Sequence, residues 1–362
     1  MKIYFTVTTD LVYDQRMIRI CTSMANAGNQ VVLVGRKMKK SVDVSKMPYE
    51  QVRLRCMFEK GKLFYIEYNI RLFLFLLFRQ MDCICAIDLD TILPCYYISK
   101  IKKTKRVYDA HELFCEMKEI ATRKNIYGFW KAIERHTVPH FKYGYTVNQP
   151  IADEFKKMYN VDYAAIRNIA LFRETSPEMS EEKFILYQGA VNEGRCFETL
   201  IPAMKWVPSK LIICGDGNFL AQAKELVAQN DLQHKVIFKG KLQPEELRTI
   251  TRKAYVGVTL FDSDGLSNYY SLANRFFDYL HAGIPQLCID FPVYREINDQ
   301  YNFSLLINDT SAQNIAAQLN KLLTDEVLYN TLQANCMKAR TEINWQKEEQ
   351  KLIAFYQKIL AN

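Results

Sequence analysis

The chain has 362 residues, of which 49% are hydrophobic and 24% are charged. This composition excludes a disordered protein, and the length favours two domains of about 150 to 200 residues over one core. Residues 1–170 contain 28 Lys and Arg against 17 Asp and Glu, a net charge of +11, whereas the remainder has a net charge of −3. We therefore expect the N-terminal half to face an anionic partner, unless it is simply a solvated basic surface.

Ten cysteines are scattered along the chain without a CxxC pair. They predict buried thiols in a reducing cytoplasm and no metal site. The signatures of nucleic-acid-binding modules are missing, so no nucleic-acid partner is predicted. The first residues begin directly as a strand and lack the apolar core of a signal peptide, which favours a cytoplasmic location.

The first βαβ unit is predicted as a strand at 2–8, an amphipathic helix at 14–27 and a strand at 30–35. The loop between the first strand and the helix contains Asp10 and Arg16, at the edge where parallel sheets bind ligands. Arg16 is expected either to meet a phosphate or to pair with Asp14 at the surface. The loop has no GxGxxG, which removes the main sequence support for a nicotinamide or flavin dehydrogenase.

Residues 63–78 are the most hydrophobic segment, but Glu67, Asn69 and Arg71 interrupt it, so it cannot cross a bilayer. We expect either a buried helix or an amphipathic helix that lies on a membrane. The densest basic cluster follows at 100–106. The N-terminal domain is therefore predicted to make peripheral contact with an anionic membrane.

Two further strands in this half end in polar residues. The strand at 83–87 leads into Asp88-Leu89-Asp90-Thr91, and the strand at 106–108 leads into Asp109-Ala110-His111-Glu112. His111 and Glu112 lie just past a carboxyl end and are expected to face a ligand. The alternative for His111 is a hydrogen-bonded structural histidine.

The second half repeats the alternation, with strands predicted at 184–187, 211–214, 236–239, 254–261 and 286–289. The loop after the first of these contains Gly189, Asn192 and Arg195. Glycines let a backbone approach a ligand closely, and an arginine at a helix entrance is well placed for a diphosphate, although a surface arginine is the alternative. After the next two strands the corresponding positions are Gly215, Gly217, Gly240 and Lys241.

Residues 260–290 predict a loop, a helix and a buried strand. Asn274 is expected to cap the helix and Gly283 to end it. Asp278 lies about one turn inside, so its carboxylate and the first backbone N–H groups would open onto one region. Such a region suits a polyol beside an anion, whereas a solvated aspartate on a helix face is the alternative.

Residues 274–285, NRFFDYLHAGIP, resemble the signature P-N-K-L-F-E-Y-x-x-A-G-x-P of glycosyltransferase family 4, the glycosyl transferases group 1. In that family the acidic residue, here Asp278, binds the nucleotide ribose, and Asn274 and Arg275 would lie in the same donor site. Asp278 replaces a glutamate and is shorter by one methylene. Many members hold the donor sugar with a second glutamate, but Tyr270 stands at that position.

Other motifs in the same order are similar to the family. The loop 187–196 resembles Y-x-G-x-L-x-x-x-R-G, in which the residue matching Arg195 neutralises the donor diphosphate; Cys196 replaces the last glycine. The family has G-x-G at 215–217, and its backbone at Gly240 meets the base. The T-D-x-x-x-D-x-R loop, DLDT and YDAHELF look like the N-domain, where the residue matching His111 faces the donor sugar.

The resemblance implies an α/β protein of the GT-B fold, with two Rossmann-like, doubly wound parallel-sheet domains facing each other across a cleft. We place an acceptor-side domain at 1–170, a linker at 171–182, a donor-binding domain at 183–344, and a helix at 345–362 that packs back on the first domain. The implied enzyme is a retaining, metal-independent hexosyltransferase that needs no cofactor. It would use a nucleotide-diphosphate sugar and a glycan or lipid-linked acceptor in envelope polysaccharide or glycoconjugate synthesis.

Two alternatives remain open. One is a sugar-nucleotide epimerase or a phosphorylase on the same two-domain fold. The other is a catalytically weak partner subunit, because Asp278 and Tyr270 both depart from the family pattern.

Overall fold

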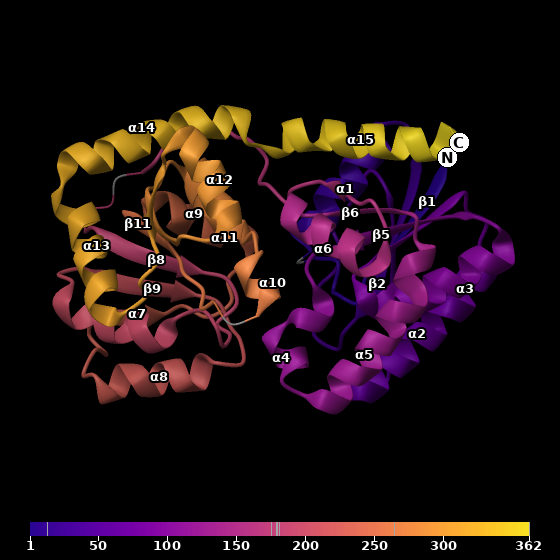
Figure 1. The fold of residues 1–362 in the computed structure, drawn as a ribbon, viewed down its shortest axis with the longest axis horizontal. Helices are drawn as coiled ribbons and strands as arrows, with labels where there is room; N and C mark the ends of the chain where they lie inside the picture. The colour runs from indigo at the N-terminus through magenta and orange to yellow at the C-terminus, as the bar shows by residue number, and fades with distance from the viewer. Residues whose placement is uncertain (13, 175, 179, 181, 264, 362) are drawn as a thin grey trace. The chain divides into compact units, whose positions relative to one another are not determined.

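The computed structural model describes residues 1–12, 14–174, 176–178, 180, 182–263 and 265–361. The chain divides into two compact units, residues 1–168 with 347–362 and residues 169–346. Each unit contains one parallel sheet with helices on both faces (Figure 1). Tyr13 of the first predicted loop and residues 175, 179 and 181 of the predicted linker lie outside the described residues.

The first unit has a seven-stranded parallel sheet in the order β3-β2-β1-β4-β5-β6-β7. Its strands are β1 (Lys2–Thr6), β2 (Gln30–Lys37), β3 (Glu50–Arg55), β4 (Cys83–Ile87), β5 (Lys105–Ala110), β6 (Tyr143–Thr146) and β7 (Ala164–Ala165). The strand order reverses at β1, which pairs with β2 on one side and β4 on the other. The loops after β1 and β4 therefore diverge and leave room for a ligand at the carboxyl edge.

Helices cover both faces of this sheet because successive strand residues point to opposite sides. One face is covered by α1 (Gln15–Asn26) and α15 (Trp345–Ala361), and the other by α2 (Gly61–Leu77), α3 (Ile92–Lys102), α5 (Lys124–Thr137) and α6 (Gln149–Tyr159). The ring of Phe5 packs on Tyr356 of α15, whereas the ring of Tyr108 packs on Phe155 of α6. Short helical turns in the connections are η1 (Leu89–Thr91), η2 (Phe114–Glu116), α4 (Lys118–Ala121) and η3 (Val138–His140).

The second unit has a six-stranded parallel sheet in the order β10-β9-β8-β11-β12-β13. Its strands are β8 (Phe184–Gln188), β9 (Lys210–Cys214), β10 (Val236–Phe238), β11 (Val256–Thr259), β12 (Gln286–Ile289) and β13 (Ser304–Ile307). Its helices are α7 (Phe197–Ala203), η4 (Met204–Trp206), α8 (Leu220–Gln229), α9 (Pro244–Lys253), α10 (Leu266–Tyr269), α11 (Asn274–Ala282), α12 (Pro292–Tyr301), α13 (Ala312–Thr324) and α14 (Glu326–Glu342). The order reverses at β8, between β9 and β11.

Helix α11 is held against the sheet by one close contact. A Cβ atom on Gly257 would lie 2.4 Å from the ring of Tyr279, so only glycine lets α11 lie this close to β11. The Tyr279 hydroxyl donates to the carbonyl of Leu186 at 2.8 Å and ties α11 to β8 as well. The first turns of α11 are thereby fixed at the carboxyl edge of the strands.

The predicted fold class is confirmed, but the edge strands β3 and β13 are among those that were not predicted. Strand β3 has no fully buried residue, and its sequence EQVRLR contains no apolar run. Strand β13 is only four residues long. Both lie at a sheet edge, where burial on one side is lost and the hydrophobic pattern weakens.

Helix α2 is not the fully buried helix of one expectation, whereas the other, a helix that lies on a membrane, stays a prediction. It buries Phe64, Tyr68, Leu72 and Leu76 against the sheet and leaves its opposite face exposed. Within the described part of the chain, no helix is both long and apolar enough to cross a bilayer.

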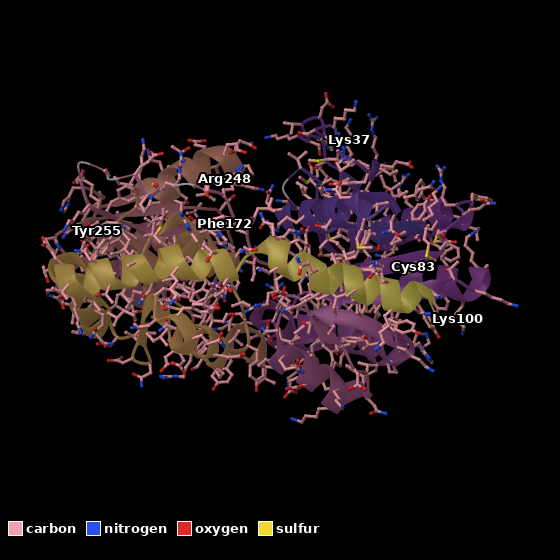
Figure 2. The ribbon with its side chains drawn as sticks, turned by 90° about the horizontal axis from the view of Figure 1, so that it is seen from above. Lys37, Cys83, Lys100, Phe172, Arg248 and Tyr255 are labelled. Carbon is pink, nitrogen blue, oxygen red and sulfur yellow. The ribbon has the colours of Figure 1, made fainter. Side chains whose placement is uncertain are left out.

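Helix α15 is fastened to the first unit by the carboxylate of Glu348, which is 1% exposed. It accepts from the backbone N–H of Arg167 at 3.0 Å, from its Nη2 at 2.8 Å and from Nζ of Lys351 at 2.8 Å. At the far end of the helix, Nζ of Lys105 donates to the carbonyl of Ile359 at 2.6 Å. Lys105 pairs across the sheet with Cys83, which is labelled in Figure 2.

Replacing Glu348 with Gln should destabilise the first unit by about 2 to 4 kcal/mol, because Arg167 would keep a partly buried charge without its counter-ion. Burial opposes ionisation of Glu348, but Arg167 and Lys351 lower its pKa overall. A lowered folded pKa contributes stability above the unfolded value of about 4.3, and this stability is lost as pH falls through the folded pKa.

Thermal unfolding of wild type, Glu348→Gln and the exposed control Glu342→Gln should therefore be compared at pH 7 and pH 4. The deficit of Glu348→Gln should shrink at the lower pH. An equal deficit at both pH values would show that the ion pair does not stabilise the unit.

Candidate functional site

In the second unit, the loops that follow β8 and β11 meet at the reversal of strand order. Arg195 Nη1 donates to Asn268 Oδ1 at 2.8 Å, and its guanidinium carbon lies 4.3 Å from the centre of the Phe261 ring. The backbone N–H of Asp262 donates to the carbonyl of Gly194 at 3.1 Å. The arginine predicted from the sequence therefore stands at the switch point, where doubly wound sheets bind their ligands.

A second arginine shares the same ring. Arg275, in the first turn of α11, is 6% exposed and lies 4.7 Å from the ring centres of both Phe261 and Tyr187. Its Nη1 donates to the Tyr187 hydroxyl at 3.2 Å, while Nε and Nη2 are buried and have no hydrogen-bond partner among the described residues. The two unpartnered nitrogens of Arg275, together with the positive charge of Arg195, suit a group with several anionic oxygens.

Gly189 lies directly beside this pair, because a Cβ atom on it would be 3.2 Å from Arg275 Nη1. Its φ of +121° is in a region that side chains rarely adopt. The loop after β8 therefore needs glycine here, both for its backbone conformation and for the approach of the arginine.

The carboxylate of Asp278 is held by a short relay that the sequence did not predict. Gln188, at the end of β8, donates from Nε2 to Asp278 Oδ2 at 2.8 Å. The Gln188 Oε1 accepts from the hydroxyl of Thr251 at 2.7 Å, and both Gln188 and Thr251 are buried. The sequence signal that could have revealed this relay is Gln188 itself, a polar residue at the end of a fully buried strand. The half-buried Asp278 is thus oriented by its neighbour on the central strand.

Several predicted residues hold loops together. A Cβ on Gly215 would lie 1.8 Å from the carbonyl oxygen of Gly189, and one on Gly217 would lie 2.3 Å from Asn192 Oδ1. Asn192 accepts from the backbone N–H of Asn218 at 3.1 Å. These residues let the loops after β8 and β9 approach each other, and their predicted approach to a ligand stays a prediction.

The remaining predicted residues of this unit lie along the same edge. The N-cap of α11 is Ala273, so the expectation that Asn274 caps the helix is wrong; Asn274 is its exposed first residue. The N–H of Ala273 donates to the Tyr294 hydroxyl at 3.0 Å. Tyr270 ends α10 and is half-buried. The turn after β10 contains Gly240, with a φ of +68°, and the exposed Lys241.

In the first unit, an alternating row of charges lies at the carboxyl ends of β4 and β5. His111 Nδ1 is 3.1 Å from Asp88 Oδ2, and its Nε2 is 3.5 Å from Asp109 Oδ2. Arg16 Nη2 donates to Asp109 Oδ1 at 2.7 Å, and both of these side chains are buried. The backbone N–H of His111 also donates to Asp88 at 3.0 Å. His111 is therefore both hydrogen-bonded and a quarter exposed, so the two alternatives for it are compatible.

The two carboxylates decide the charge of His111. Burial disfavours the imidazolium, but Asp88 and Asp109 outweigh it and raise the pKa of His111 to about 10. Burial, aided by Asp88, raises the pKa of Asp90 to about 7, and Asp90 accepts a hydrogen bond from Thr8. Asp88 and Asp90 were not among the predicted site residues, although the DLDT motif contains both.

The loop after β1 is arranged differently from the prediction. Arg16 pairs with Asp109 and not with Asp14, whose carboxylate caps α1 by accepting from the backbone N–H of Met17 at 3.0 Å. Asp10 is buried, accepts from Ser41 and lies 3.7 Å from Arg53. Glu112 follows His111 and is half-buried. In the described residues, no group of three or more His, Cys, Asp or Glu side chains is arranged to hold a metal ion.

Part of this chain is similar to a known protein family and to characterised proteins. Residues 168–340 match the family described as glycosyl transferases group 1. The O-antigen chain mannosyltransferase RfbU of Salmonella typhimurium (strain LT2) is 23% identical over 177 residues, covering 47% of this chain and 48% of that protein. The chitobiosyldiphosphodolichol beta-mannosyltransferase of Candida albicans (strain SC5314) is 25% identical over 181 residues, covering 46% of this chain and 39% of that protein. The chain thus matches about half or less of the length of these curated relatives.

The structural likeness extends over both units. The crystal structure of Anabaena Alr3699/HepE in complex with UDP-glucose has a TM-score of 0.77 at 12% identity, covering 99% of each chain. This likeness concerns the fold, which joins two Rossmann-like domains in one chain. The resemblance seen in the sequence is confirmed: residues 168–340 are a glycosyl transferases group 1 domain, in a chain of the GT-B fold.

Proposed function

We propose that this glycosyltransferase is a retaining enzyme that transfers a hexose from a nucleotide-diphosphate sugar to a glycan or lipid-linked acceptor. The observation that carries the proposal is the arrangement at the switch point of the second sheet. There Arg195 and Arg275 share the Phe261 ring, and Asp278 is oriented by Gln188. Cations for a diphosphate and a fixed carboxylate for a ribose are what a nucleotide-sugar donor requires.

The donor would be held by its diphosphate and its ribose. Arg195 and the unpartnered nitrogens of Arg275 bind the diphosphate oxygens, and Asp278 accepts from two ribose hydroxyls. Each charge-assisted bond of this kind contributes about 1.5 to 3 kcal/mol. Asn274, Gly189, Gly240 and Lys241 line the same carboxyl edge and complete the nucleotide site. HepE, which shares the fold, is described in complex with UDP-glucose.

The transfer breaks the bond between C1 of the sugar and the diphosphate oxygen and forms a bond from C1 to the acceptor oxygen. The acceptor hydroxyl gives its proton to the departing phosphate oxygen on the same face. Negative charge grows on the diphosphate as the bond breaks, and the two arginines stabilise it, so the reaction is proposed to need neither a metal ion nor a cofactor. Water exclusion favours transfer over hydrolysis.

The first unit is proposed to hold the acceptor and the donor sugar. His111 acts as an imidazolium that stabilises negative charge, because Asp88 and Asp109 keep it protonated. It is therefore not the general base. Asp10, Arg16 and Glu112 shape the acceptor side, with Arg16 acting through Asp109, and Tyr270 of the second unit lies on the donor-sugar side.

The acceptor is proposed to belong to envelope polysaccharide or glycoconjugate synthesis, at the inner face of the cytoplasmic membrane. RfbU is named for the O-antigen chain, and the Candida relative is named for a diphosphodolichol. The net charge of +11 over residues 1–170 favours an anionic surface.

A panel of UDP-, GDP- and dTDP-sugars tests the function as a whole. Slow hydrolysis of one donor, or transfer to added glycan, supports the proposal. Conversion of one nucleotide sugar into its epimer would indicate an epimerase. Donor binding without any turnover would favour the alternative of a catalytically weak partner subunit. Asp278 and Tyr270 support that alternative because both depart from the family pattern.

Replacing Asp278 with Asn should weaken binding of the preferred nucleoside diphosphate by about 10- to 100-fold, because two charge-assisted bonds to the ribose become neutral ones. Asparagine keeps the size of the side chain and an acceptor for Gln188. Calorimetry with UDP and GDP measures the effect, and Asp299→Asn, an exposed aspartate on α12, is the control. Unchanged affinity in Asp278→Asn would remove the ribose assignment.

Replacing Arg195 with Gln should lower kcat by about 10²- to 10³-fold while the affinity for the nucleoside without phosphates survives, because charge develops on the diphosphate mainly in the transition state. Steady-state kinetics and nucleoside titration separate the two effects. Arg248→Gln, at a half-buried arginine of α9 that pairs with Glu245, should change neither. Equal loss of nucleoside and diphosphate binding would assign Arg195 to a structural role.

His111 should remain protonated well above neutral pH, and its imidazole resonances in NMR should titrate near pH 10. A raised folded pKa means that its ion pairs stabilise the fold fully below about pH 6.5, and this stability is lost as pH rises through 10. Asp88→Asn should lower the titration midpoint. A midpoint near 6.5 in the wild type would contradict the cationic role.

A further inference from the structure

Helix α2 carries a continuous row of exposed apolar side chains, which we call the α2 stripe. Its members are spaced three or four residues apart and range from 51% exposed at Leu74 to 82% at Phe78; they are Leu63, Ile66, Ile70, Leu74 and Phe78. This spacing places them on one side of the helix. The other side is buried on the sheet. A helix that is apolar on both faces is normally buried all round, so the exposed face is suited to an apolar environment outside this unit.

The charges around the α2 stripe are almost all positive. Lys60, Lys62, Arg71 and Arg79 are exposed on or beside the helix. Glu59, just before this segment, accepts from the backbone N–H of Lys39 at 2.8 Å. The one acidic residue between 60 and 79 is Glu67, and its carboxylate is already engaged. It accepts from the backbone N–H groups of Met57 at 2.9 Å and Phe58 at 3.0 Å and from Arg71 Nε at 2.8 Å.

The beginning of the α2 stripe lies near the candidate acceptor edge of the first unit. The Tyr68 hydroxyl donates to the carbonyl of Val7, just past the end of β1, and Asn69 donates to the carbonyl of Asp90 at 2.9 Å. The first two turns of α2 therefore stand beside the carboxyl ends of β1 and β4. Met57 and Phe58, which precede the helix, are also exposed and extend the apolar surface there.

We propose that the α2 stripe is the surface by which the first unit docks on an anionic lipid bilayer. The helix lies parallel to the membrane, its apolar side chains enter the boundary between head groups and acyl chains, and the flanking lysines and arginines meet the lipid phosphates. A second copy of the chain fits this face less well, because two such surfaces would bring like charges together. The inference deepens the proposed function by naming the surface that would bring the enzyme to a membrane-borne acceptor.

The experiment compares binding of the full chain to phosphatidylcholine vesicles with and without phosphatidylglycerol. Ile66→Gln, Ile70→Gln and Leu74→Gln combined keep every charge and replace exposed residues only, so the fold should be retained. The combined variant should bind anionic vesicles at least about tenfold more weakly than wild type. Val327→Gln, at a 79% exposed position on α14 of the other unit, should bind as wild type does.

A second measurement reports insertion directly. In Ile70→Trp the new indole should show blue-shifted emission with anionic vesicles, and in Val327→Trp it should not. Unchanged vesicle binding by the combined variant, or an unshifted indole emission in Ile70→Trp, would overturn the proposal. Binding of anionic vesicles would then be assigned to basic residues such as 100–106. The proposal would also be overturned if the wild type did not bind vesicles but self-associated through the α2 stripe. The stripe would then be an interface between two copies of the chain.

The test is independent of the enzyme assay. The affinity for UDP and GDP is measured on the same variants, and it should not change because the α2 stripe lies in the other unit. Loss of vesicle binding with intact nucleotide binding tests the docking surface alone. Failure of nucleotide binding in the wild type concerns the proposed function instead.

Discussion

The second unit depends on the contact between Tyr279 and Gly257. Because glycine leaves room for the ring, α11 lies directly on β11, and the Tyr279 hydroxyl reaches across to β8. Arg275 and Asp278 stand on the turns of α11 that precede and include this contact, so their positions follow from it. Any side chain at residue 257 would lift the helix and move the second arginine and the carboxylate together.

The two units accommodate their buried charged side chains in different ways. In the first unit, buried charges compensate one another, since Arg16, Asp109, His111 and Asp88 form an alternating row. In the second unit, Arg275 contacts the Tyr187 hydroxyl and two aromatic rings, and its Nε and Nη2 have no hydrogen-bond partner in the described part of the chain. Among the described residues, Arg16 Nη1 and His111 Nε2 also lack a hydrogen-bond partner, but each charge in the row stands beside an opposite charge. Arg275 packs between aromatic rings instead, which suits an anion that arrives from outside. This difference agrees with a donor site on the second unit.

The sequence predicted what depends on local pattern. Strand β12 has the predicted bounds and helix α11 ends where predicted, because their apolar periodicity and the Gly283 stop signal are strong; α11 begins one residue earlier than predicted. It did not predict β3, whose residues are only half covered. It also missed the relay through Gln188, because the partners Thr251 and Asp278 are 63 and 90 residues away. Contacts of that kind arise from strand order, which no local pattern contains.

The first unit is built from two separated pieces of chain, residues 1–168 and 347–362. The rings of Phe5 and Tyr145 on its sheet are covered by Phe355 and Tyr356, which belong to the second piece. During synthesis on the ribosome, the whole second unit emerges before that cover exists. While residues 169–346 are translated, the part of this sheet face that α15 covers is therefore exposed, although α1 already covers another part, and chaperones have time to bind there.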